Sequence, residues 1–287
     1  MISRRFVVLL MVSALCFTQL WATEGENGVN WHKNLDRAIE LAKEKSAPLL
    51  IRFWTELSDP LRKVDSNSWA NKQLITLSKK FVCVSVKVAH SKGKLASYRI
   101  KNLPTTVIFD SGQNELVRFI NFTKAEDLIE AMMLVPGDYS EVKDSLPIIK
   151  KDKKNLKALM DIAYFYATNR SPGLSNEYFS RALKTKEAKK DPELKGQITF
   201  SLGANHLKMG NFKKALKIFN KASNKLKDTK YTEMILLGLL QTQLKLGKIK
   251  QAQATYKRIQ SQFPNSKTLQ VAAAAMKRAG ENVGSSR

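Results

Sequence analysis

The feature that most limits how this chain can fold is a pattern of small and aromatic residues that recurs in its second half. In residues 196–229 the pattern consists of Leu202, Gly203, Gly210, Phe212, Ala215, Phe219 and Ala222. The same offsets recur in residues 233–266, at Leu239, Gly247, Ile249, Ala252, Tyr256 and Pro264. Small residues let two helices approach closely, and aromatic residues fill the space between them. The pattern therefore predicts a stack of helical hairpins, in which each unit buries its apolar face against its neighbours.

The offsets resemble those of the tetratricopeptide repeat, a helical hairpin of 34 residues. A less regular unit, residues 156–189, has Leu159, Ile162, Ala163, Tyr166, Phe179 and Ala182 in register. The resemblance implies an all-α domain over residues 156–280 with repeats at 156–189, 196–229 and 233–266, a capping helix near 268–278 and a tail at 281–287. Three repeats are close to the minimum for a stable stack. The alternative is a generic helical array with chance matches.

Tetratricopeptide domains bind extended segments or helices in a groove lined by the first helix of each repeat. By repeat register, the residues of this groove would be Lys157, Met160, Tyr164, Phe200, Ala204, Leu207, Lys208, Leu237, Gln241 and Lys245. The alternative for each of them is packing in the core between helices. Met160 and Tyr164 depart from the Lys/Asn pair that clamps a terminal carboxylate in chaperone-binding relatives, so that specificity is not expected here.

The first half of the chain alternates helical and strand-like segments. Apolar periodicity predicts a helix over 31–45, a second from Pro60 to about residue 80, and a last one that Thr123 caps and that runs to Val135. Apolar or β-branched runs predict strands at 49–54, 81–88, 105–110 and 116–122. This order is typical of an α/β sandwich with mixed strand directions.

Two segments of this half resemble the signatures of the thioredoxin family. Residues 53–62, Phe-Trp-Thr-Glu-Leu-Ser-Asp-Pro-Leu-Arg, lie over the family's F-W-A-E-W-C-G-P-C-K. Residues 98–105 lie over the second signature, which ends in a cis-proline (here Pro104) and a threonine. The resemblance implies a thioredoxin-like domain over residues 30–137, and we expect a linker at 138–155 before the repeats.

The departures from the family concern its redox chemistry. Ser58 and Leu61 occupy both cysteine positions, and disulfide exchange needs a thiolate and a resolving thiol. Arg52 falls where the family has a buried acid that assists proton transfer. The one cysteine in the domain, Cys83, lies in a strand and is expected to pack in the core. We therefore expect no enzyme activity; the alternatives are an atypical thiol–disulfide oxidoreductase, using Cys83 or a partner's cysteine, and an accessory protein of a redox pathway.

The surface around these positions would survive the loss of the cysteines. In the family, an extended peptide lies beside the cis-proline. The corresponding surface here would comprise Trp54, Ser58, Asp59, Pro60, Leu61, Leu103 and Pro104. The alternative is that these residues only maintain the fold.

The first 22 residues read as an export signal. Arg4 and Arg5 precede an apolar run over residues 6–17, and Ala22 ends the segment with a small residue. We expect cleavage near Ala22 and a periplasmic or secreted bacterial protein with no transmembrane span in the mature chain; the alternative is an uncleaved helix that anchors it. Cleavage would remove Cys16 and leave Cys83 without a partner for an intramolecular disulfide.

The formal net charge is +24, and it is concentrated in the second half. Residues 23–140 carry 17 Lys/Arg against 14 Asp/Glu, whereas residues 141–287 carry 30 against 11. Such an excess either forms a solvated face or attracts an acidic protein, an envelope polymer or a phospholipid surface. Nucleic acid is not expected, because no recognised motif accompanies the charge.

The three histidines, His32, His90 and His206, are isolated from one another and from cysteines, so no metal site or cofactor is expected. The sequence thus predicts an exported, non-redox adaptor that binds a protein or peptide partner or an anionic component of the cell envelope.

Overall fold

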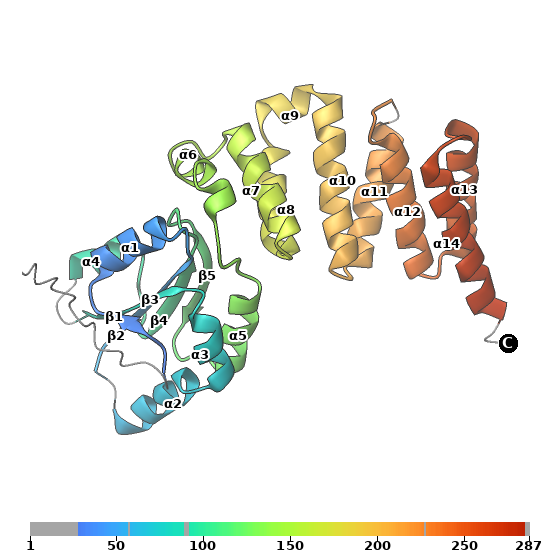
Figure 1. Cartoon of the computed structure of the whole chain (residues 1–287). Helices are drawn as coiled ribbons and strands as arrows, with labels where there is room; N and C mark the ends of the chain where they lie inside the picture. The colour runs from blue at the N-terminus through green and yellow to red at the C-terminus, as the bar shows by residue number, and fades with distance from the viewer. Residues whose placement is uncertain (1–27, 57, 89–91, 227, 285–287) are drawn as a thin grey trace, which may run out of the picture.

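The computed structural model describes residues 28–56, 58–88, 92–226 and 228–284, so the expected signal peptide lies outside the described residues. Two parts follow one another along the chain: a β-sheet flanked by helices, and a stack of helices (Figure 1). Within the described ranges, none of the helices is both long and apolar enough to cross a membrane.

The first part is built on a mixed sheet of five strands. They are β1 (Trp31–His32), β2 (Leu49–Trp54), β3 (Val82–Lys87), β4 (Thr105–Phe109) and β5 (Glu115–Ile120), in the spatial order β1-β3-β2-β4-β5. β3 pairs in parallel with β1 and β2, whereas β4 is antiparallel to β2 and to β5. The central strand β2 is apolar because helices cover both of its faces.

Helices cover the two faces of this sheet. They are α1 (Leu35–Glu44), α2 (Asp59–Trp69), α3 (Lys72–Ser78), α4 (Lys92–Ser97) and α5 (Ala125–Met133). Successive side chains of a strand point to opposite faces, so Ile51 packs with α1 and α4 while Leu50 packs with α3 and α5. The peptide bond between Leu103 and Pro104 is cis. The expected α/β sandwich, with a thioredoxin-like strand order, is thereby confirmed.

Three local predictions for this part were wrong. Residues 31 and 32 form β1 rather than helix, because Trp31 pairs with Cys83 across the sheet, and Asn34 caps α1 by accepting from the Arg37 N–H. The helix expected from Pro60 to residue 80 is divided into α2 and α3, because Asn71 starts a new helix by accepting from the N–H groups of its first turn. Thr123 is not the cap of α5; Lys124 holds that position.

The stretch expected as a linker, residues 138–155, is instead folded. It contains a 3₁₀ turn (Ser140–Val142) and α6 (Ser145–Lys151). Val142, Leu146 and Ile149 recur at helical spacing and are buried against the helix that follows. The Tyr139 N–H donates to the Ser46 carbonyl at 2.7 Å, which ties this stretch to the sheet domain. The two parts are therefore joined by a packed junction.

The second part is a stack of helices (Figure 1). They are α7 (Leu156–Thr168), α8 (Pro172–Ala182), α9 (Lys186–Lys190), α10 (Pro192–Lys208), α11 (Phe212–Lys225), α12 (Thr232–Lys245), α13 (Ile249–Gln262) and α14 (Lys267–Gly284). The three expected hairpins are α7/α8, α10/α11 and α12/α13. The last helix is longer than expected and takes in the first residues of the expected tail, up to Gly284.

Close packing around Phe219 explains part of the repeat pattern. A Cβ added at Gly203 or at Gly238 would lie 2.5 Å from the ring of Phe219. The ring is thus held between α10 and α12, and both helices need glycine where they face it. Gly210 and Gly247, which follow the first helices of their hairpins, have φ of +72° and +69°, which glycine adopts readily.

Candidate functional site

The surface predicted from the thioredoxin signatures lies at one end of the central strands. Phe53 pairs with Thr105, so Trp54 and Pro104 follow at adjacent ends of β2 and β4. Ser58 is exposed and precedes α2, Pro104 is buried, and Leu103 is half-buried against the core. Asp59, Pro60 and Leu61 form the first turn of α2, and their side chains lie outside the described part of the structure.

Cys83 is in the core, as predicted. Its side chain is 2% exposed, and burial raises the pKa of its thiol to about 12. It pairs with Leu50 in the sheet, four residues before Trp54, which is a separation of about 13 Å along the strands. The thiol is therefore buried and distant from Ser58.

Arg52 forms a partly buried ion pair at the position where the thioredoxin resemblance implies an acid. Its guanidinium donates to the carboxylate of Asp65 on α2, and that carboxylate also accepts from the Trp69 indole N–H at 3.2 Å. Burial lowers the pKa of Arg52, and the charge of Asp65 partly offsets this effect. The guanidinium lies 5.4 Å from the ring centre of Trp54 and 5.7 Å from that of Trp69. The cation is held by one carboxylate and two indoles.

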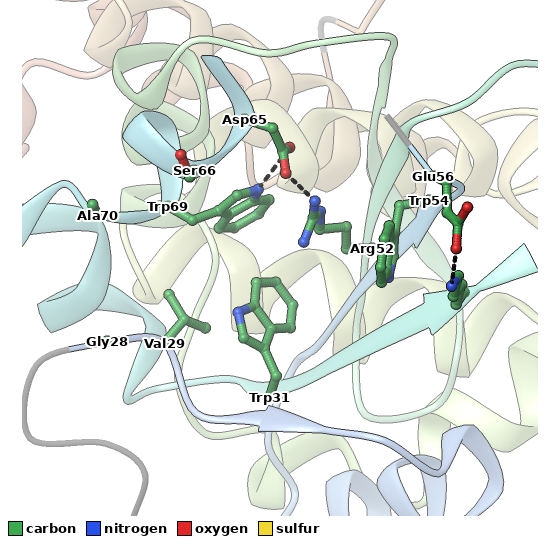
Figure 2. A pocket seen from close by; sticks show the side chains of 11 residues that line it. Gly28, Val29, Trp31, Arg52, Trp54, Glu56, Asp65, Ser66, Trp69 and Ala70 are labelled. Carbon is green, nitrogen blue, oxygen red and sulfur yellow. Dashed lines mark hydrogen bonds and ion pairs between the residues drawn. The ribbon is translucent and has the colours of Figure 1, made fainter. Parts of the chain in front are cut away.

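A cavity of about 700 Å³ opens beside this ion pair (Figure 2). Its walls include Trp31, Trp54 and Trp69, all three tryptophans of the described residues. Trp31 and Trp69 pack edge to face, with ring centres 4.8 Å apart. The cavity thus combines aromatic walls with a partly buried arginine.

Two buried donors belong to residues of this cavity. Arg52 Nε and Trp54 Nε1 have no hydrogen-bond partner within the described ranges. Lys87, at the end of β3, pairs with Glu56 at 2.7 Å and lies over the Trp54 ring. An uncharged hydrogen-bond acceptor on an apolar or planar group is the ligand chemistry that suits such a lining.

Sequence reasoning found Arg52 and Trp54 but missed the rest of this pocket. Asp65 and Trp69 are four residues apart on α2, so they share one face of that helix. Their pairing with the strand depends on how α2 packs on the sheet, and no local pattern encodes that. Trp31 was missed because it was assigned to a helix.

The predicted groove residues all lie on the first helices of the hairpins. Lys157, Met160 and Tyr164 are on α7, and the others are on α10 and α12, which pack against each other. Each of the ten is exposed or half-buried, so none is a fully buried core residue. The Tyr164 ring rests edge to face on Phe179 at 5.1 Å, and Lys157 pairs with Asp161 at 2.8 Å.

Together, the strand order of the sheet and the helical hairpins give the fold of this chain: a thioredoxin-like α/β part followed by a stack of hairpins arranged like tetratricopeptide repeats. The family model described as tetratricopeptide repeat matches residues 236–266, which span most of α12 and α13. No curated protein matches the chain.

Solved structures of thioredoxins are similar to the first part. A thioredoxin from Thermus thermophilus is 19% identical with a TM-score of 0.33, and the match covers 37% of this chain and 85% of that one. The protein Trxlp from Edwardsiella tarda is 20% identical with a TM-score of 0.30, over 36% of this chain and 98% of that one. A disulphide isomerase from Xylella fastidiosa is 18% identical with a TM-score of 0.26, over 42% and 98%.

Proposed function

We propose that this chain is an exported adaptor that binds protein partners and does not exchange disulfides. A thioredoxin-like domain joined to tetratricopeptide repeats indicates a role in protein interaction or in a redox-related process. The absence of an accessible thiol at the expected site favours the role in protein interaction. Ser58 and Leu61 occupy the two cysteine positions, and Cys83 is buried.

The chemistry of Cys83 argues against its use as a nucleophile. With a pKa of about 12, roughly one thiol in 10⁵ is ionised at pH 7, and the thiolate is the attacking species. A disulfide substrate would also need to reach a side chain that is 2% exposed. Neither requirement for exchange is met at this position.

The binding surface that we propose is formed by the first helices of the repeats. Phe200, Ala204 and Leu207 of α10 and Leu237 of α12 offer half-buried apolar surface, and Lys208 and Lys245 are exposed beside it. Apolar contacts would supply affinity, and the lysines would favour a segment that carries acidic residues. Export through residues 1–22 would place this surface in the periplasm or outside the cell.

Insulin reduction by dithiothreitol tests the absence of redox activity. The full chain is expected to leave the rate at that of dithiothreitol alone, and an ordinary thioredoxin serves as the positive control. The proposal fails if the chain accelerates the reaction and Cys83→Ala abolishes that acceleration.

Site-specific crosslinking tests the binding surface. A photoreactive residue at position 204 of α10 is expected to capture a partner in cell envelopes, and the same residue at exposed Gln253 on α13 is the matched control. Equal capture at both positions would remove the support for a specific groove. Fractionation of cells that express the tagged chain tests its export.

A further inference from the structure

The second helices of the last two hairpins, α11 and α13, carry no carboxylate. α11 has five lysines, most of them four residues apart and therefore on one side of the helix, and α13 has two lysines and an arginine. The first helices, α10 and α12, each contain a glutamate. Among the described residues neither α11 nor α13 takes part in an ion pair. Positive charge is thus concentrated on one set of helices.

A cavity of about 400 Å³ lies between these two helices, with α12 as its floor. Asn220 of α11 and Gln251 of α13 are among the lining residues with amide side chains, and Lys248 and Arg258 are its basic residues. Arg258 donates to the Ser223 carbonyl at 3.1 Å, which holds the guanidinium between α11 and α13. The lining therefore combines two cations with amide donors and contains no carboxylate.

The floor of the cavity is fixed by a buried hydrogen bond. The Thr255 hydroxyl donates to Gln243 Oε1 at 2.8 Å, and both side chains are buried. Because the amide oxygen is engaged as an acceptor, the orientation of the Gln243 amide is defined. This part of the lining is set before any ligand arrives, which lowers the entropic cost of binding.

We propose that this cavity binds a phosphate group, carried either by a small molecule or by a lipid headgroup. Arginine and lysine with amide donors are the groups that recognise phosphate oxygens, and a nearby carboxylate would oppose it. The lysines of α11 would raise the local concentration of such an anion. This inference does not rest on the adaptor function, because it involves other helices and another chemistry.

The test compares two double variants of the full chain. Asn220→Asp with Gln251→Glu adds two carboxylates to the cavity lining at exposed positions, with little change of side-chain size. The matched control, Gln253→Glu with Gln260→Glu, adds the same charge at exposed positions on the opposite side of α13.

Two probes distinguish the sources of the phosphate: inorganic pyrophosphate, followed by titration calorimetry, and phosphatidylcholine vesicles with and without phosphatidylglycerol, followed by sedimentation. For a probe that binds, the cavity variant is expected to lose about tenfold or more in affinity, and the control about twofold or less. Binding of pyrophosphate would identify a soluble ligand, and binding to anionic vesicles alone would identify a lipid headgroup; either result supports the site when the cavity variant loses more affinity than the control. Equal losses in the two variants, or no binding of either probe, would overturn it.

Discussion

The packing of Phe219 gives a prediction whose sign depends on the structure. In an exposed helix, replacing glycine by alanine stabilises by about 1 kcal/mol. At Gly238, however, the new Cβ would lie 2.5 Å from Cζ of Phe219 and 2.8 Å from two further ring atoms. The ring has little space to move away, because a Cβ at Gly203 of α10 would also lie 2.5 Å from its Cζ and Cε1 atoms.

The cost of the added methyl group is therefore that of overpacking a closed site, about 1–3 kcal/mol, and the rigid surroundings favour the upper end. After the gain in helix propensity is subtracted, Gly238→Ala is expected to lower the free energy of unfolding by about 2 kcal/mol. Gly173→Ala is the matched control, because its Cβ would meet nothing closer than 4.0 Å, and it is expected to be neutral or to stabilise.

Urea unfolding, followed by far-ultraviolet circular dichroism, measures the free energy of unfolding of both variants. The signal reports on the repeats because most of the helical residues lie there. Phe219→Leu should cost less in the Gly238→Ala background than in the wild type, because the smaller side chain relieves the contact. A neutral or stabilising effect of Gly238→Ala would show that the ring is not held between α10 and α12 as described.

Two further predictions concern buried charge in the first part and its junction. Asp65→Ala leaves the partly buried Arg52 cation without its partner, and is expected to lower the free energy of unfolding by about 2–3 kcal/mol in urea titrations followed by tryptophan fluorescence, between the values for exposed and for fully buried pairs; a loss below about 1 kcal/mol would contradict a pair shielded from solvent. Burial raises the pKa of Asp110 from 3.8 to about 6, so the folded state binds the proton more tightly, and the free energy of unfolding should fall by up to about 3 kcal/mol as the pH rises from 4 to 7. Asp110→Asn should flatten this part of the profile, and an unchanged slope would assign it to other groups.

The sequence predicted the elements whose patterns are local. The apolar run of residues 49–54 became the central strand, and the offsets of Gly203 and Phe219 located a helical hairpin. The sequence also predicted the role of Gly203, which is to let two helices approach closely. A small residue is needed wherever two helices pack at short distance. Gly238 of α12, which faces the same ring, was missed because no repeat offset marks it.

The errors fall where contacts distant in sequence decide the outcome. β1 has only two residues and is defined by its pairing with β3. It is too short for an alternation of apolar and polar residues, so the sequence does not predict it. Residues 138–155 were expected to be a linker because a Pro-Gly-Asp turn at 136–138 and a charged stretch at 150–154 bound them; the apolar residues between these two features form α6 instead.

The sequence predicted only part of the candidate site, because contacts between residues distant in sequence form the rest. Arg52 was recognised as a cation in place of an acid, but its partner lies on α2, thirteen residues further along the chain. The tryptophan walls of the pocket come from three separate elements. Local sequence patterns identify each of these residues, but they do not predict that the residues lie close together in the fold.

The most direct test of the central claim, that no reactive thiol serves the thioredoxin-like domain, is alkylation of Cys83 by iodoacetamide in the native chain, with the modified peptide identified by mass spectrometry. Because the side chain is 2% exposed and its pKa is about 12, we predict no modification near neutral pH until urea unfolds the domain. Rapid alkylation of Cys83 in the folded protein at pH 7 would contradict the account.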